Sequence, residues 1–397
     1  MARSRFGIIA SLLFTPRESI RDPLVVVEDE RILSVASRES TDTPANLRIV
    51  NFPDAILGPG LVDIHIHGGA GHDVMEGDED ALAAIEGHLA RNGTTSYFPT
   101  TVTAPVDATL RSLEKLGAAI ERSGNGDLRA QPLGVHLEGP FISHAKRGIH
   151  PAEYIQPPSL ELFDRMWQAA GGHVGLITIA PEVPGATELI AEAARRGICV
   201  SLGHSDSDLE PVQVAMLAGA RHATHTFNAM RPLDHRNPGI LGAVLADPGL
   251  TADIIADGIH VHPEVVRLFL QAKGPEAAVL ITDGLSAAGM GDGRYRLGWF
   301  EFEVQGDRCT RDGTLAGSVL TLSRAVANVM KFADWNLKDA IRLATLNPAR
   351  VAGVATRQEG SKLVPWKGVV EPGADADLVV VSASGEVIRT IVRGAGI

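Results

Sequence analysis

Two histidines separated by one residue form the most suggestive chemical pattern in the chain. His65 and His67 lie in an apolar stretch that runs from Pro59 to Gly69. Residues i and i+2 of a β-strand point to the same face, so the pattern predicts that both imidazoles converge on one point. Neutral imidazole is the commonest metal-ligating side chain. Because an isolated His-x-His pattern more often arises by chance, the interpretation depends on the rest of the chain.

Four further polar residues end or follow apolar runs that are typical of strands. They are Glu138 after 133–137, His204 after 199–202, His225 at the end of 222–225 and Asp283 after 279–282. In an α/β barrel the active site lies at the carboxyl ends of the strands. Chance would rarely place so many ligand-type residues at that edge. Together with the two histidines above, they predict one site.

The residue types suggest a division of roles. Glu138, His204 and His225 form the donor set of a metal site that leaves one position open for water. A metal there lowers the pKa of water toward ~7 and polarises a substrate carbonyl. We interpret Asp283 as the general base that takes the proton of that water and gives it to a leaving amine. The alternatives for Asp283 are a further metal ligand or a helix N-cap.

Composition and charge exclude several classes of function. The chain has 397 residues, of which 45% are hydrophobic, and its formal net charge is −12. Because no basic stripe interrupts this acidic balance, nucleic-acid binding is not expected. No stretch reaches about 18 uninterrupted apolar residues, so no membrane span is expected. The two cysteines, Cys199 and Cys309, form no Cys-x-x-Cys pattern, which favours a reducing, cytoplasmic setting.

The elements that position these residues predict a TIM-like (β/α)8 barrel with a small β-sandwich formed from both termini. Residues 1–57 contain short strand-like runs and are predicted to be the N-terminal half of the sandwich. Residues 58–355 alternate apolar strands with Ala-, Leu- and Glu-rich helical stretches, which indicates βα units around a parallel sheet. Residues 356–397 return to β character and are predicted to be the C-terminal half of the sandwich.

The expected elements are as follows. The stretch with His65 and seven further runs give eight barrel strands: 94–99, 132–137, 175–180, 199–202, 222–225, 251–255 and 278–282. Helices are predicted at 78–92, 108–123, 160–170, 186–196, 209–218, 263–272, 320–332 and 337–343. Terminal strands are predicted at 8–14, 24–27, 32–35, 47–57, 368–370, 376–381 and 387–392.

Six short motifs together resemble a known family of enzymes. They are 59–69, 135–141 around Glu138, Gly203-His204-Ser205, 225–230, 256–260 and Thr282-Asp283-Gly284. They are similar to those of the N-acetylglucosamine-6-phosphate deacetylases within the amidohydrolase superfamily, and the resemblance covers nearly the whole chain. It implies metal-dependent hydrolysis of N-acetyl-D-glucosamine 6-phosphate to D-glucosamine 6-phosphate and acetate, in amino-sugar catabolism or recycling.

The resemblance also implies residue roles. Glu138, His204 and His225 match the principal metal ligands, and Asp283 matches the catalytic aspartate. The expected substrate contacts are Ile149, His150, Asn228, Ala229, Asp257, His260, Leu315, Ala316 and Gly317. Arg236 matches an arginine that binds phosphate in the site of a neighbouring subunit, which implies a homodimer. A guanidinium suits phosphate, although Arg236 taken alone is more often a solvated surface residue.

Several alternatives stay open. Some family members carry Gln-x-Asn in place of His65-x-His67, so one or two divalent ions (zinc, iron, manganese or cobalt) are expected, with Glu138 as the bridge if two bind. The superfamily's bridging lysine has no counterpart, because 173–182 contains no lysine. The basic segment 144–147 either screens the phosphate or is a solvated loop. Rival functions are hydrolysis of N-acetylgalactosamine 6-phosphate or another N-acyl compound, and a non-catalytic barrel that binds a sugar phosphate.

Overall fold

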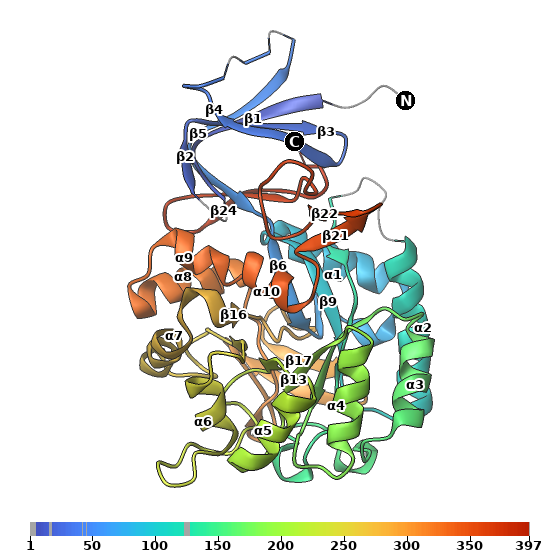
Figure 1. Ribbon diagram of the computed structural model, residues 1–397. Helices are drawn as coiled ribbons and strands as arrows, with labels where there is room; N and C mark the ends of the chain where they lie inside the picture. Colours follow the sequence, from blue (N-terminus) through green and yellow to red (C-terminus); the bar gives the residue numbers. More distant parts are fainter. Residues whose placement is uncertain (1–4, 16–17, 42, 45, 123–127, 397) are drawn as a thin grey trace.

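The computed structural model describes residues 5–15, 18–41, 43–44, 46–122 and 128–396. A barrel of strands and helices makes up most of the molecule, and a β-sheet built from both ends of the chain lies against one end of the barrel (Figure 1). The predicted α/β organisation is therefore confirmed.

The barrel contains the eight predicted parallel strands. They are β6 (Leu61–Ile66), β9 (Thr94–Thr101), β11 (Val135–Glu138), β12 (Val174–Ile179), β13 (Cys199–Leu202), β14 (His222–Ala223), β15 (Ala252–Ile254) and β16 (Ala278–Leu280). A continuous ladder joins β6 to β14 in that order, and β15 pairs with β16. Backbone bonds close the ring, from Thr226 N to Asp253 O at 2.9 Å and from Asp283 N to His65 O at 2.9 Å. Both closing bonds lie at the carboxyl ends of the strands.

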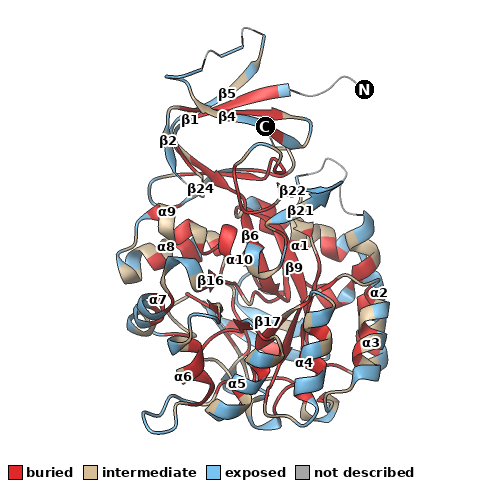
Figure 2. Ribbon diagram, in the orientation of Figure 1, coloured by how far each residue is buried: buried red, intermediate tan, exposed pale blue. Residues whose placement is uncertain are grey.

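Helices cover the outside of this ring. They are α1 (Glu79–Arg91), α2 (Val106–Arg122), α3 (Leu160–Ala169), α4 (Ala186–Arg195), α5 (Leu209–Ala218), α6 (Gly239–Ala246), α7 (Pro263–Ala277), α8 (Leu322–Ala333), α9 (Leu337–Arg342) and α10 (Leu346–Val351). Their inner faces are buried and their outer faces are exposed (Figure 2). In α2, Leu113 and Leu116 are buried while Arg111 and Glu114 face solvent, which is the 3.6-residue pattern of an amphipathic helix.

Eight helices agree with the prediction and two were missed. The predicted end of α2 at Ser123 lies outside the described residues. α6 has the sequence GILGAVLA, whose uniform apolarity gives no helical period, and α10 contains Pro348 in its first turn. These features hid both helices from pattern analysis.

Strands from both termini form one sheet. Its order is β24 (Val387–Ile391), β23 (Leu378–Val381), β5 (Arg48–Pro59), β1 (Arg5–Phe14), β3 (Pro23–Glu28) and β4 (Arg31–Ser37), and β2 (Ser19–Arg21) pairs with β1. β5 passes through Gly60 directly into β6. The predicted strand 368–370 is wrong, because Gly368 has a φ of 73°, outside the extended region. A hairpin of β21 (Thr356–Glu359) and β22 (Lys362–Pro365) precedes that segment instead.

A small antiparallel sheet is inserted after β16 and was also missed. It consists of β17 (Gly293–Leu297), β18 (Phe300–Gln305), β19 (Arg308–Arg311) and β20 (Thr314–Leu315). In β18, Phe300, Phe302 and Val304 are buried and alternate with exposed residues. This alternation was the available signal. We call these four strands the inserted sheet.

Short elements complete the structure. They are β7 (Gly68–Gly69), β8 (His72–Asp73), β10 (Gln131–Pro132) and three 3-10 turns at Val74–Glu76, His144–Lys146 and Ala152–Tyr154. Among the described residues, no helix has the length and apolarity needed to span a bilayer.

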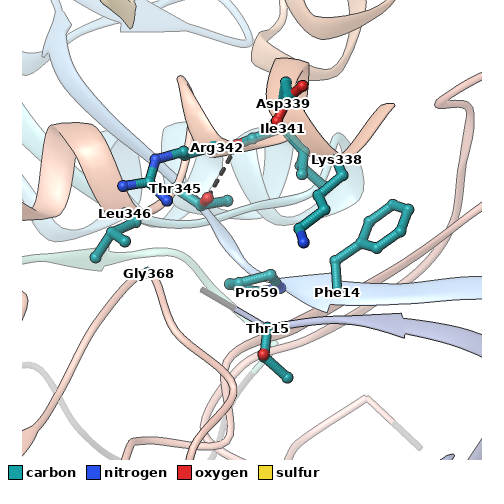
Figure 3. A pocket seen from close by; sticks show the side chains of 10 residues that line it. All are labelled: Phe14, Thr15, Pro59, Lys338, Asp339, Ile341, Arg342, Thr345, Leu346 and Gly368. Atoms are coloured by element: carbon teal, nitrogen blue, oxygen red, sulfur yellow. Dashed lines mark hydrogen bonds between the residues drawn. The ribbon is translucent and has the colours of Figure 1, made fainter. Parts of the chain in front are cut away.

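The terminal sheet packs on the amino-terminal end of β6. A small pocket of about 40 Å³ marks this junction, where Phe14 and Pro59 of the sheet face Lys338 of α9 (Figure 3). The hydroxyl of Thr345 donates to the carbonyl of Ile341 at 2.9 Å and so is already paired. Because the sheet occupies this end, the opposite end, with the carboxyl ends of the strands, is left for a functional site.

Candidate active site and metal centre

The two histidines of the His-x-His pattern point to one place, as the strand alternation predicted. His65 and His67 are buried, and their Nε2 atoms lie 3.3 Å apart. Every residue of β6 is buried, and His67 directly follows the strand, so the backbone of this segment fixes the direction of both rings. Asp63 strengthens this arrangement, because its carboxylate accepts a 2.6 Å bond from the hydroxyl of Thr282 and thereby joins β6 to the end of β16.

Glu138 lies at the centre of the cluster. Its Oε1 atom is 3.1 Å from Nε2 of His204, 3.0 Å from Nε2 of His225 and 3.4 Å from Nε2 of His65. Its Oε2 atom is 3.2 Å from Nε2 of His67. One buried carboxylate therefore contacts imidazoles that come from three different strand ends.

These side chains form two groups with metal-binding geometry. One contains His65, His67 and Glu138, and the other contains Glu138, His204 and His225, with the ligand atoms of each group within 4.8 Å of one another. Both groups are fully buried and share Glu138. Imidazole and carboxylate are ligands that zinc and other divalent transition metals accept.

The second nitrogens of two imidazoles orient the rings. Nδ1 of His67 donates to the carbonyl of Thr100 at 3.0 Å, and Nδ1 of His204 donates to the carbonyl of Lys146 at 2.9 Å. The Nε2 atoms of these rings therefore carry lone pairs directed into the cluster. Nε2 of His204 lies only 3.0 Å from Nε2 of His225. Nε2 atoms that converge in this way can share a bound cation, so these residues suit a divalent metal ion.

Unusual backbone conformations turn the site residues toward the barrel axis. His204, His225 and Asp283 have positive φ values of 47°, 31° and 47°. Non-glycine residues in this region cost about 1–3 kcal/mol each and occur preferentially at functional sites. Each of them lies two or three residues after the end of a strand, which explains how three strand ends present their side chains to the same point.

The charges of the cluster are set by its burial and by mutual contact. Burial disfavours protonation of His67, but the carboxylates of Asp283 and Glu138, which accept hydrogen bonds from its ring, outweigh burial and raise the pKa of His67 to about 10 when no metal ion is bound. Nε2 of His67 then carries a proton, and a bound cation would take the place of that proton. Burial opposes ionisation of Asp283, yet the adjoining imidazoles, His67 first, lower the pKa of its carboxyl group. The pKa of Glu138 is lowered in the same way by the surrounding histidines. Both carboxylates are therefore ionised at neutral pH.

A cavity of about 350 Å³ opens above the cluster. Most of the sequence-predicted site residues line it: His67, Glu138, Ile149, His150, His204, His225, Asn228, Ala229, His260, Asp283, Leu315, Ala316 and Gly317. Its size is in the range of small-ligand sites. The inserted sheet supplies one wall, through Leu297 and Thr314–Leu315.

Three predicted residues lie elsewhere. His65 belongs to the metal-binding groups but does not reach the cavity surface. Asp257, expected to contact substrate, is not among the residues that line the cavity, and its carboxylate is bonded to His260, which does line it. Arg236 is exposed on the segment 231–238, outside the cavity of its own chain.

Several cavity residues were not predicted. Val102 follows β9, Leu297 ends β17 and Thr314 begins β20. Ala145 and Lys146 belong to the basic segment 144–147, for which the sequence allows either a phosphate screen or a solvated loop. The ammonium group of Lys146 lies 3.6 Å from Asp206. Valine and leucine at strand ends carry no chemical signal in a sequence, so only the fold identifies them.

Comparison with known proteins identifies the family. Residues 56–396 match the amidohydrolase family. The chain belongs to this amidohydrolase family. This amidohydrolase is 39% identical over 386 residues to an N-acetylglucosamine-6-phosphate deacetylase of Bacillus subtilis (strain 168), covering 96% of this chain and 94% of that relative. The predicted resemblance is therefore confirmed.

Solved structures and a second relative agree. The amidohydrolase superimposes on N-acetyl-D-glucosamine-6-phosphate deacetylase of Mycobacterium smegmatis, an aspartate-to-alanine variant in complex with N-acetyl-D-glucosamine-6-phosphate, with a TM-score of 0.89, 31% identity and 99% coverage of both chains. It is also 36% identical over 340 residues to an N-acetylgalactosamine-6-phosphate deacetylase of Escherichia coli O157:H7, covering 85% of this chain and 87% of that relative. The predicted barrel with a terminal β-domain is confirmed by this likeness.

Proposed function

We propose that this amidohydrolase hydrolyses the acetamide of N-acetylglucosamine 6-phosphate to glucosamine 6-phosphate and acetate. The observation that carries the proposal is the shared carboxylate of Glu138, which joins two imidazole groups beside Asp283 at the floor of the cavity. The names of the similar proteins support an amino-sugar phosphate as the substrate.

The chemistry follows from the donor set. Glu138, His204 and His225 would hold a divalent ion, which would lower the pKa of a water molecule and polarise the acetyl carbonyl. Asp283, ionised in its buried position, accepts the proton of the attacking water and delivers it to the amine that leaves. The water oxygen thus joins the acyl carbon, the carbon–nitrogen bond breaks, and the amine departs neutral.

We propose that two ions bind, one in each group around Glu138. Zinc, iron, manganese and cobalt all suit these ligands, so the identity of the metal must be measured. Elemental analysis of the purified protein should give two ions per chain. His67→Ala should reduce the content to one, whereas one ion in the unaltered protein would contradict the proposal.

We propose that the phosphate group of the substrate is bound by Arg236 of a neighbouring subunit. Arg236 is exposed, and its backbone N–H donates to Asp234 at 2.8 Å, so the backbone of the segment is held while the guanidinium remains accessible. This supports a homodimer in which Arg236 serves the partner's cavity. Light scattering should give twice the chain mass, and Arg236→Ala should raise KM for the phosphorylated sugar by about tenfold or more.

A cytoplasmic setting is part of the same proposal. Cys199 and Cys309 are free thiols. Burial raises the pKa of each thiol to about 12, which keeps both protonated and unreactive. Unpaired cysteines of this kind support the predicted reducing compartment, and the proposed reaction would place the enzyme in amino-sugar recycling.

The deciding experiment measures acetate release by metal-replete protein. N-acetylglucosamine 6-phosphate is compared with its unphosphorylated form and with N-acetylgalactosamine 6-phosphate. The latter is the second candidate substrate, because the relative from Escherichia coli O157:H7 is named an N-acetylgalactosamine-6-phosphate deacetylase. We expect the unaltered protein to release acetate from N-acetylglucosamine 6-phosphate. The variant Asp283→Asn should lose this activity, and the exposed control variant Asp334→Asn should keep it. Faster turnover of the galactosamine derivative would reverse the preference. No acetate from any substrate would favour a binding protein without catalysis.

A further inference from the structure

Val102 lies between the anchors of two imidazoles of the active site. Two residues before it, the carbonyl of Thr100 accepts the 3.0 Å bond from Nδ1 of His67. Directly after it, the hydroxyl of Thr103 pairs with Nδ1 of His150 at 2.8 Å. Val102 itself lines the cavity and is only 2% exposed. Its position is therefore fixed from both sides.

These two imidazoles reach the same oxygen of the central carboxylate. Oε2 of Glu138 is 3.2 Å from Nε2 of His67 and 3.4 Å from Nε2 of His150. The wall that carries Val102 is thus the wall next to the reacting centre.

Leu297 completes an apolar corner with Val102. It also lines the cavity and is 1% exposed. The next residue, Gly298, lies against the valine, because a Cβ atom placed on it would meet Cγ1 of Val102 at 2.9 Å. Gly298 has a φ of 52°, so the turn both requires glycine for its conformation and leaves no room for a side chain. We call Val102 and Leu297 the apolar corner.

Hydrogen bonds hold the apolar corner rigidly. The hydroxyl of Ser286 donates to the carbonyl of Arg296 at 2.7 Å, and the backbone N–H of Gly298 donates to Asp73. On the other side, the backbone N–H of Val102 points to the sulfur of Met75 at 3.3 Å. A wall fixed in this way does not widen to admit a larger group, because packed interiors tolerate added methylenes poorly.

We propose that the apolar corner binds the methyl group of the substrate's acetyl substituent and limits the length of the acyl chain that is hydrolysed. The inference rests on the proposed function. The acyl carbon must lie beside Glu138 and Asp283 for the amide to be cleaved, so its methyl group is one bond from the reacting centre. Val102 lies on the segment that anchors His67 and His150, and Leu297 lies beside it in the same cavity, so these two apolar side chains are suited to a methyl group and oppose a longer chain.

The test compares kcat/KM for the N-acetyl, N-propionyl and N-butyryl derivatives of glucosamine 6-phosphate. One extra methylene in a fixed apolar site costs roughly 10–200-fold, so the unaltered protein should prefer acetyl over propionyl by about tenfold or more. Val102→Ala should reduce this preference about tenfold, and Val102→Ile should increase it. Val212→Ala, a buried valine of α5 outside the cavity, is the matched control and should leave the ratio unchanged.

A general loss of stability would lower all three rates together, whereas the proposal requires opposite changes of the ratio in the alanine and isoleucine variants. Leu297→Val provides a second opening of the same corner should Val102→Ala not fold, and it should also reduce the preference. An unchanged acetyl-to-propionyl ratio in the variants that still release acetate would overturn the inference. Absence of acetate release by the unaltered protein would instead overturn the proposed function on which the inference rests.

Discussion

Nδ1 of His260 lies 2.6 Å from Oδ2 of Asp257. The other carboxylate oxygen of Asp257 accepts backbone bonds of 2.8 Å from Ile259 and from His260 itself. Nε2 of His260 is buried and has no hydrogen-bond partner among the described residues, although the side chain lines the cavity. Asp257 therefore holds the ring in one orientation and leaves a polar atom free for a substrate.

Asp257→Asn should weaken substrate binding more than turnover. Loss of the carboxylate removes the charged acceptor that holds the His260 ring in its orientation. We expect KM for N-acetylglucosamine 6-phosphate to rise about tenfold with a smaller change in kcat, because charge-assisted bonds are roughly twice as strong as neutral ones. Steady-state kinetics beside Asp334→Asn provides the check. Equal KM values in the two variants would show that the carboxylate does not act through the imidazole.

Arg311 should act as a positioning residue between the two walls of the cavity. From β19 it donates to the carbonyl of Ile149 at 2.9 Å, and its guanidinium lies 4.2 Å from the centre of the Phe300 ring. Arg311→Ala should raise KM by about three- to tenfold because this bond to a charged donor is lost. Arg311→Lys should recover part of the loss. Arg308→Ala, an exposed arginine on the same strand, should have no effect, and a rise in KM there would argue for a general effect of charge.

Glu138→Gln should empty the metal centre. The substitution keeps the shape of the side chain and removes the negative charge that faces the buried imidazoles. Metal content measured by elemental analysis should fall for both groups at once, and activity should fall by at least about 100-fold. Removal of metal from the unaltered protein with a chelator should reproduce the loss of activity. Added divalent metal should restore the activity of the chelated unaltered protein but not that of Glu138→Gln. Full metal content in the variant would contradict the shared role, and Glu161→Gln on the surface of α3 is the control.

Glu86 should make the protein less stable as the pH rises. Burial raises the pKa of its carboxyl group from 4.5 to about 7, against the opposing hydrogen bond from Tyr97. The folded chain therefore binds this proton more tightly than the unfolded chain, so stability falls between pH 4.5 and pH 7. The loss should be about 1–3 kcal/mol after allowance for partial exposure. Denaturant unfolding at pH 5 and pH 8 should show a smaller difference in the free energy of unfolding for Glu86→Gln than for the unaltered protein. An equal difference in both proteins would assign the pH dependence to other groups.

The cluster of His65, His67, Glu138, His204, His225 and Asp283 could be predicted from the sequence, because strand geometry determines where these side chains point. His65 and His67 share a face by their spacing, and the ends of parallel strands in a barrel meet at one edge. Glu138 and Asp283 then followed from their positions after apolar runs. No homologous structure was needed to bring these side chains together, although their roles as ligands and base remain predictions.

Other parts of the site depended on contacts between distant segments. Val102 and Leu297 are typical core residues in any sequence pattern, and only the folding of the inserted sheet over the barrel turns them toward the cavity. Asp257 was expected to contact substrate because it belongs to a motif with His260, but a motif does not state which of its side chains faces inward. Arg236 lies on an exposed segment whose function depends on a second chain.

The sheet built from both termini has a consequence for biosynthesis. Val380 of β23 pairs with Leu57 of β5, and the entire barrel lies between them in the sequence. Such distant pairing is slow to form, and chains fold from the amino terminus while they are made. On the ribosome, β5 therefore keeps one edge unpaired until β23 has emerged. The terminal sheet is completed only after the whole barrel segment has been made, and until then the unpaired edge of β5 is open to aggregation.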